Sequence, residues 1–195
     1  MLKESVTFVC VLKSGKEYNQ DHVKRLMDMV NSHYSFPYKF LVLSDLEVAC
    51  CENVQLQHNW KGWWSKLELF LHDFGKTIYF DLDIDIVKSI DWMSDIDPDD
   101  SIHGYRCPIY PRLLNSSVMI WKNAKHNILE GYSPKVNKFW KVWPHRYGDQ
   151  SWIQRKMFNR LQFLPSEHIE RYGREKSKDS TSIVVYGGKI RPWNK

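Results

Sequence analysis

The most constraining feature of the sequence is an apolar run that leads directly into alternating aspartates. Residues 77–80 read Thr-Ile-Tyr-Phe, a composition typical of a buried β-strand, and Asp81 and Asp83 follow at once. Because side chains alternate along an extended chain, we expect both aspartates on one face, with Leu82 and Ile84 pointing to the core. The sequence therefore predicts two carboxylates held side by side at the end of a buried strand.

Two such carboxylates need something to relieve their repulsion. At a separation of about 5 Å and an effective dielectric of about 20, two like charges repel by roughly 3 kcal/mol. A bound cation, a shared proton or good solvation offsets this cost, and a set of oxygen ligands favours Mg²⁺, Mn²⁺ or Ca²⁺ over Zn²⁺. The pattern predicts a divalent metal at Asp81 and Asp83, with an acidic strand end exposed to water as the alternative.

Strand-like and helix-like segments alternate along the chain. Residues 6–12 form an apolar, β-branched run, and Asp21 is placed to cap a helix that includes Val23 and Val30. Further strands are expected at 38–43, 77–80, 117–121 and 182–186, and further helices at 63–71, 134–143 and 149–158. This alternation predicts an α/β fold with a mostly parallel central sheet flanked by helices, whose ligands bind at the carboxyl ends of the strands.

Composition favours one globular domain, residues 1–195, and excludes several classes of protein. The chain has 195 residues, 43% of them hydrophobic, which suffices for a sizeable core. The net charge of +5 is compatible with a phosphate-bearing ligand but lacks the concentrated basicity of a nucleic-acid-binding protein. No stretch approaches the roughly 20 apolar residues of a membrane span, and the four cysteines contain no CxxC pair. We expect a cytoplasmic protein without a disulfide framework, a membrane span or a nucleic-acid partner.

Five short segments occur in an order that covers most of the chain. They are Gly-Trp-Trp-Ser-Lys-Leu at 62–67, Tyr-Phe-Asp-Leu-Asp at 79–83, Leu-Asn-Ser-Ser-Val-Met at 114–119, Gly-Asp-Gln at 148–150 and Gly-Lys-Ile-Arg-Pro-Trp at 188–193. Together they resemble the GT-A-fold glycosyltransferases, in particular the retaining, family-8-like group and its small bacterial, plant and viral relatives. A bare DxD motif is common, but five segments in the family's order make the resemblance specific.

The resemblance implies a single Rossmann-like GT-A domain that transfers a sugar from a nucleotide-sugar donor, a UDP- or GDP-sugar, with retention at the anomeric carbon. It leaves three classes of acceptor open: a glycan, a protein or a small molecule. A divalent cation, Mn²⁺ or Mg²⁺, would bridge the DxD motif and the diphosphate and neutralise the charge on the leaving group. A nearby carboxylate or amide oxygen would support the oxocarbenium-like sugar.

The resemblance also assigns roles to individual residues. Asp149 and Gln150 take the catalytic position beside the anomeric centre, and Asp81 and Asp83 take the position of metal ligands. The expected donor-binding residues are Lys13, Tyr18, Lys66, Asp81, Asn115, Gly188 and Arg191. Structural alternatives remain for three of these: a helix cap for Asp149, a turn residue for Asn115 and a surface lysine for Lys66.

One position departs from the family's pattern. Relatives usually carry a metal-binding histidine directly before the glycine that corresponds to Gly188, whereas this chain has Gly187. The metal site is then left with carboxylates, diphosphate oxygens and water, and His145 and His168 are candidate substitutes. Arg191 replaces the usual lysine and can still bind phosphate, because a guanidinium offers two parallel donors.

Two other functions stay open. A haloacid-dehalogenase-like phosphohydrolase would use Asp81 as its nucleophile, although Asp85 and Ile153 stand where that family has Thr or Val and a second acid. The other alternative is a catalytically silent module that binds a nucleotide-sugar or a glycan. Aromatic residues that either stack on sugar faces or belong to an aromatic core are Trp60, Trp63, Trp64, Trp140 and Trp143.

Overall fold

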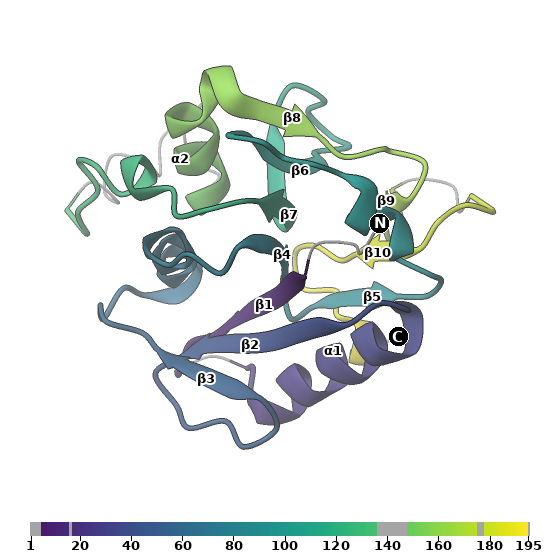
Figure 1. Ribbon diagram of the computed structural model, residues 1–195, viewed down its shortest axis with the longest axis horizontal. Helices are drawn as coiled ribbons and strands as arrows, with labels where there is room; N and C mark the ends of the chain where they lie inside the picture. Colours follow the sequence, from purple (N-terminus) through teal and green to yellow (C-terminus); the bar gives the residue numbers. More distant parts are fainter. Residues whose placement is uncertain (1–4, 16, 136–147, 175–177, 195) are drawn as a thin grey trace.

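The computed structural model describes residues 5–15, 17–135, 148–174 and 178–194. Its centre is a seven-stranded sheet in the order β3-β2-β1-β4-β7-β6-β8 (Figure 1). The strands are β1 (Val6–Leu12), β2 (Tyr38–Ser44), β3 (Glu52–Gln55), β4 (Lys76–Phe80), β6 (Ile102–Arg106), β7 (Leu114–Trp121) and β8 (Leu161–Phe163). Neighbouring strands are parallel except where β7 pairs with β4 and β6. The predicted α/β fold with a mostly parallel central sheet is confirmed.

The order of the strands creates a ligand-binding position at the centre of the sheet. From β1 the chain proceeds to β2 and β3 on one side, whereas β4 lies on the other side of β1. The carboxyl ends of β1 and β4 therefore flank a topological switch point, the crevice where open α/β sheets bind their ligands. β1 leads there into Lys13, and β4 leads into Asp81.

α1 (Gln20–His33) is capped by Asn19, so the prediction of Asp21 as the cap is wrong. The Asn19 side chain accepts a hydrogen bond from the backbone N–H of Asp21 at 3.0 Å, and the His22 ring accepts one from the N–H of Asn19 at 3.1 Å. Asn and Asp are equally good caps, so the pattern alone did not separate two candidates two residues apart. Asp21 instead lies in the first turn, where its charge complements the helix dipole.

The other predicted helices differ in type and extent. The helix expected at 63–71 is a 3₁₀-helix, η1 (Gly62–Leu71), and the one expected at 149–158 is α2 (Asp149–Lys156) followed by η5 (Phe158–Arg160). The helix expected at 134–143 falls mainly on residues outside the described part of the chain. Further short 3₁₀-helices are η2 (Asp91–Asp95), η3 (His126–Ile128) and η6 (Pro192–Asn194).

A small second sheet, in the order β5-β10-β9, lies beside the central one (Figure 1). Its strands are β5 (Ile84–Ile86), β9 (Ile169–Arg171) and β10 (Ile183–Val185), of which β10 was expected at 182–186. β10 is antiparallel to β5 and parallel to β9. Because β4 belongs to the central sheet and β5 to the second, Asp81 and Asp83 lie in the connection between the two sheets.

Both faces of the central sheet are covered by apolar side chains. On β1, Phe8 belongs to a buried cluster that includes Leu26 of α1, whereas Val9 belongs to a second cluster that includes Leu67 of η1 and Trp152 of α2. A strand buried on both faces shows a continuous apolar run instead of an alternating one. This is why residues 6–12 could be recognised as a central strand.

Three predictions concern features other than the sheet. Within the described ranges, no helix has both the length and the hydropathy needed to cross a membrane. The four cysteines are free. The single domain and the cytoplasmic location stay predictions.

Candidate active site

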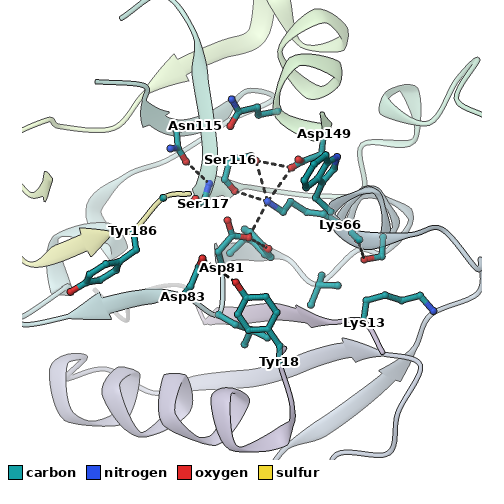
Figure 2. Close-up of a pocket in the computed structure, with 18 of the residues that line it drawn as sticks. Lys13, Tyr18, Lys66, Asp81, Asp83, Asn115, Ser116, Ser117, Asp149 and Tyr186 are labelled. Carbon is teal, nitrogen blue, oxygen red and sulfur yellow. Dashed lines mark hydrogen bonds and ion pairs between the residues drawn. The ribbon is translucent and has the colours of Figure 1, made fainter. Parts of the chain in front are cut away.

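A cavity of about 590 Å³ opens at the crevice between the carboxyl ends of β1 and β4 (Figure 2). The residues with a predicted site role all line it: Lys13, Tyr18, Lys66, Asp81, Asp83, Asn115, Asp149, Gln150, Gly188 and Arg191. They come from segments far apart along the chain, so the fold brings them together. Their individual roles remain predictions.

Lys66 is the centre of a buried polar network in this cavity (Figure 2). Its Nζ lies 3.0 Å from Asp81 Oδ1 and 3.0 Å from Asp149 Oδ2. It also donates a hydrogen bond to Ser116 Oγ at 3.1 Å, and the Ser116 hydroxyl donates to Asp149 Oδ2 at 2.7 Å. Lys66 thus connects the strand-end aspartate with the first residue of α2.

This network excludes two of the structural alternatives. Lys66 is only 5% exposed, so it is no surface lysine. Burial alone would lower the pKa of Lys66, but the charges of Asp149 and Asp81 outweigh it and hold the pKa above its usual value. Asp149 does not cap α2 through its side chain, because the residue before the helix is Gly148 and no side-chain cap is formed.

Asp83 is held from the other side of the cavity. It accepts a hydrogen bond from the Tyr18 hydroxyl at 3.0 Å, and Arg191 Nη1 lies 3.4 Å from the same carboxylate oxygen. Burial and then the charge of Asp81 raise the pKa of Asp83 to about 6, although Arg191 and Tyr18 act in the opposite direction. At neutral pH this carboxyl group is ionised at a cost, which a further cation would reduce.

Asp81 is fixed by the two neighbouring strands. Its backbone N–H donates to the Ser117 carbonyl on β7 at 2.9 Å. The hydroxyl of Tyr79, two residues earlier on β4, donates to Asp81 Oδ1. Asp81 and Asp83 therefore face one cavity from a connection that both sheets hold in place.

The residues fit a divalent cation that takes only part of its ligands from the protein. Asp81 and Asp83 supply hard oxygen ligands of the kind that Mg²⁺ and Mn²⁺ accept. Across the described ranges, no group of three or more His, Cys, Asp or Glu side chains is arranged to hold a metal. His168 stacks on Trp92, at 4.6 Å between ring centroids, and does not line the cavity. His145 lies outside the described residues. The remaining ligands would be diphosphate oxygens and water.

The space that a side chain at position 187 would need is occupied by a neighbouring guanidinium group. A Cβ atom at residue 187 would overlap the guanidinium of Arg171, which comes from β9. A side chain at this position therefore requires Arg171 to move. Arg191 is held nearby, where it donates to Glu17 Oε1 through Nε at 2.8 Å and to the Gly188 carbonyl through Nη1 at 2.9 Å.

Asn115 and Gln150 offer amide groups to the cavity. Asn115 is the second residue of β7, which begins three residues earlier than predicted. Its Oδ1 accepts a hydrogen bond from the N–H of Ser117 at 2.9 Å, so its amide nitrogen is the group that a ligand would meet. Gln150 follows Asp149 in the first turn of α2.

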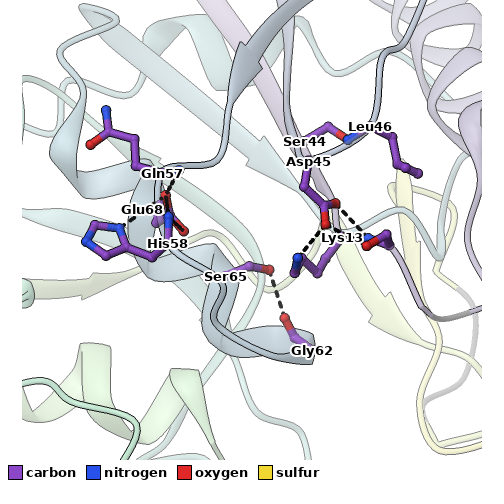
Figure 3. A network of polar contacts seen from close by, with 10 residues as sticks. Lys13, Ser44, Asp45, Leu46, Gln57, His58, Gly62, Ser65 and Glu68 are labelled. Carbon is purple, nitrogen blue, oxygen red and sulfur yellow. Dashed lines mark hydrogen bonds and ion pairs between the residues drawn. The ribbon is translucent and has the colours of Figure 1, made fainter.

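Lys13 lines the cavity, and its side chain contacts a neighbouring carboxylate (Figure 3). Its ammonium forms an ion pair with Asp45, to which the backbone N–H of Ser14 also donates at 2.8 Å. Burial would raise the pKa of Asp45, but the hydrogen bonds from Lys13 and Ser14 lower it to about 2. An ammonium has three N–H donors, so the ion pair with Asp45 leaves Lys13 able to donate to a ligand as well.

A second polar contact in Figure 3 fixes η1. Glu68 is fully buried and accepts hydrogen bonds from the backbone N–H groups of Gln57 at 2.6 Å and His58 at 3.1 Å. The Ser65 hydroxyl donates to the Gly62 carbonyl at 2.8 Å. These bonds tie η1 to the segment after β3 and so hold Lys66 in position.

Solved structures share this fold, although no protein-family model and no curated protein matches the sequence. The galactosyltransferase LgtC, crystallised in complex with donor and acceptor sugar analogs, gives a TM-score of 0.72 at 14% identity over 96% of this chain and 89% of LgtC. The apo form of the glycosyltransferase GlyE from Streptococcus pneumoniae TIGR4 gives 0.73 at 13% identity over 98% of this chain and 57% of GlyE. The bifunctional glycosyltransferase WbbM gives a TM-score of 0.65 at 12% identity over 97% of this chain and 47% of WbbM.

The chain therefore has the fold of these glycosyltransferases, as the sequence predicted. It covers most of LgtC but only about half of GlyE and WbbM. Identities of this size establish the fold, and the assignment to the retaining, family-8-like group stays a prediction.

Several residues of the site were not singled out from the sequence. Tyr79 precedes Asp81 by two positions, and the period of a strand would have placed both on one face. Ser116 lies within a segment that carried the resemblance, but its bond to Asp149 depends on how β7 and α2 pack. Glu17 gave no signal, because its partner Arg191 is 174 positions away.

Proposed function

We propose that the protein is a retaining glycosyltransferase, similar to the family-8-like group, that uses a UDP- or GDP-sugar with Mn²⁺ or Mg²⁺. The observation that carries the proposal is the placement of Asp149 in one cavity with Asp81 and Asp83, joined to Asp81 through Lys66. A sugar diphosphate needs positive charge around its leaving group and an oxygen beside its anomeric carbon. The cavity offers groups for both.

The diphosphate fits the end of the cavity near Asp83. Arg191 offers guanidinium N–H groups to phosphate oxygens. Burial and the charge of Asp83 raise the pKa of Tyr18 and keep its hydroxyl protonated, so that it donates to Asp83 and holds this carboxylate in place. A cation held by Asp81 and Asp83 would supply Lewis-acid neutralisation of the departing diphosphate.

The sugar fits the end of the cavity near Asp149. In the transfer the anomeric C–O bond breaks and its electron pair leaves with the diphosphate, while the acceptor oxygen forms the new bond. The acceptor proton passes to the departing phosphate oxygen. Asp149, which Lys66 and Ser116 hold in a fixed orientation, stabilises the positive charge that develops on the sugar.

The deciding experiment supplies a panel of UDP- and GDP-sugars with Mn²⁺ and measures release of nucleoside diphosphate. With an α-linked donor we expect an α-configured product by ¹H NMR. Asp149→Ala should reduce release by about 100-fold, since a group aimed at developing charge is lost, while nucleotide affinity falls much less. Asp97→Asn is the control, because Asp97 is 67% exposed and lies outside the cavity.

The other outcomes separate the alternatives. A β-configured product contradicts retention. Nucleotide-sugar binding without release from any donor indicates a silent binding module. Beryllofluoride trapped on Asp81, together with phosphate release from phosphate esters, indicates the phosphohydrolase.

A further inference from the structure

Trp63 and Trp64 are neighbours in η1 but have opposite environments. Trp64 is 7% exposed and stacks on Tyr132 in the core, with 5.2 Å between the ring centroids. Trp63 is 61% exposed and lines the cavity that contains Asp149. Trp64 therefore has the core-packing role, one of the two that the sequence left open for its tryptophans, whereas Trp63 belongs to the cavity wall.

The local backbone holds Trp63 in the cavity wall. Residues i and i+3 of a 3₁₀-helix lie on one side, so Trp63 shares a side with Lys66. Gly148 packs so closely on the indole that a Cβ atom there would overlap Nε1 and two ring carbons. Gly148 directly precedes Asp149, and the indole is therefore fixed one residue away from it.

Trp63 adjoins the Asp149 side of the site, whereas the proposed diphosphate lies near Asp83. Asp83 contacts Tyr18 and Arg191. Asp81, two residues before Asp83, contacts Lys66, which in turn contacts Asp149. Gly148 and Trp63 follow beyond Asp149. A donor bound in this direction places its sugar beside Asp149 and leaves the indole free to contact the second substrate.

We infer that Trp63 is the stacking platform for a pyranose acceptor, so the acceptor is a glycan. This inference rests on the proposed function. An exposed indole is a flat apolar surface that matches the C–H face of a pyranose ring, whereas polar side chains around it bind the hydroxyls. The amide of Gln150 lines the same cavity. An acceptor on Trp63 would direct a hydroxyl toward the anomeric carbon beside Asp149.

The test compares Trp63→Ala and Trp63→Phe with Phe158→Ala. Phe158 is 75% exposed and does not line the cavity, so it controls for the loss of an exposed aromatic ring. Three quantities are measured: nucleoside diphosphate release in water, KM for methyl β-D-glucopyranoside and methyl β-D-galactopyranoside as acceptors, and the ¹H–¹⁵N resonance of the Trp63 indole. That resonance is the one missing from the Trp63→Phe spectrum, and sorbitol serves as an acyclic polyol control.

We expect Trp63→Ala to raise the acceptor KM about tenfold, because a stacked aromatic contact is lost. Release in water should fall by a clearly smaller factor than the rise in acceptor KM, and Trp63→Phe and Phe158→Ala should stay within about threefold of the wild type in KM. The pyranosides should shift the Trp63 resonance with nucleotide bound, and sorbitol should not. An unchanged KM in Trp63→Ala, or a loss of release as large as the loss of transfer, overturns the inference.

Failure of the proposed function gives a different result. If no donor releases nucleoside diphosphate, the glycosyltransferase assignment fails, and the indole resonance still decides on the platform. A shift with the pyranosides then identifies Trp63 as a glycan contact of a binding module. If neither pyranoside shifts the resonance, the inference that Trp63 is a stacking platform is also wrong.

Discussion

The buried ammonium group of Lys66 lies between two carboxylates. If one partner of such a network is removed, the remaining charges stay buried without compensation, which destabilises the folded state. We predict that Lys66→Met destabilises the protein by about 3 to 5 kcal/mol at pH 7, the range for breaking a buried ion pair. Urea unfolding measures the change. The double variant Lys66→Met with Asp149→Asn should recover most of the loss, because it removes a charge that has lost its partner.

The double variant also supplies the outcome that would contradict this prediction. If Lys66→Met with Asp149→Asn is no more stable than Lys66→Met alone, packing, and not charge, explains the loss.

The partly buried Asp83 carboxylate reduces the stability of the protein at neutral pH. Its pKa of about 6 in the folded protein lies above the value of about 3.9 for an unfolded aspartate, so folding favours the protonated form. Between pH 4 and 6 the folded state holds more protons than the unfolded state, and stability falls as the pH rises. Above pH 6 the full cost, about 3 kcal/mol, is present.

We therefore predict that Asp83→Asn is more stable than the wild type at pH 7.5 in metal-free buffer, by roughly 1 to 2 kcal/mol. The two proteins should be equally stable near pH 3, because Asn resembles the protonated acid. Mn²⁺-stimulated turnover should be lost in the same variant. A variant that is less stable at pH 7.5 would show that the contacts with Tyr18 and Arg191 outweigh the burial of the charge.

At the scale of elements, the junction between η1 and α2 depends on one glycine. Gly148 has φ of +64° and ψ of −136°, a backbone conformation that is close to glycine-only, and a Cβ atom would also strike Trp63. We predict that Gly148→Ala costs about 2 to 6 kcal/mol, the sum of backbone strain and overpacking. Gly131→Ala is the control for a Cβ atom added at positive φ, because Gly131 has φ of +71° with no atom within 4 Å of the added carbon.

The control should lose only a backbone strain of about 1 kcal/mol. Adding Trp63→Ala to Gly148→Ala should remove the overpacking and leave the backbone strain. A double variant that is no more stable than Gly148→Ala would show that the indole moves aside without cost.

Long central elements could be predicted from the sequence, and short peripheral ones could not. β1, β2 and β4 are apolar on both faces, so a local run of residues identifies them. β8, β9 and β10 have three residues each, too few for a period, and their pairing depends on distant partners. The second sheet was therefore not expected, although residues 182–186 were recognised as a strand.

In the candidate site, too, local patterns could be predicted and tertiary contacts could not. Asp81 and Asp83 could be predicted because residues two positions apart at the end of a strand lie on the same face. Lys66 could be placed in the site from its motif, but its bonds to Asp149 and Ser116 are tertiary contacts. The partners of Arg191 could not be predicted either, because sequence patterns carry no information on which side chains remote in the sequence are in contact.

At the scale of the whole molecule, Arg191 brings a late segment of the chain onto Asp83. A guanidinium at 3.4 Å competes with a cation for the same carboxylate. We predict that Arg191→Ala binds Mn²⁺ a few-fold more tightly in the absence of nucleotide, and binds UDP or GDP about tenfold more weakly.

Isothermal titration of Mn²⁺, with and without UDP or GDP, measures both effects. In the wild type, metal and nucleotide should strengthen each other's binding by the same factor. Metal affinity that is independent of nucleotide would mean that the cation does not bridge the diphosphate. Glu17→Gln tests whether the ion pair with Glu17 sets the position of the Arg191 guanidinium.

The contact between Glu17 and Arg191 joins positions 174 residues apart, which matters while the chain is being made. At a synthesis rate of about 5 to 20 residues per second, Glu17 leaves the ribosome roughly ten seconds or more before Arg191. A nascent chain that ends before Arg191 has its acidic residues in place but lacks the guanidinium expected to bind phosphate. Under the proposed function, we expect stalled or prematurely terminated products to be unable to consume sugar nucleotides, and only chains translated through this segment would draw on the cell's supply.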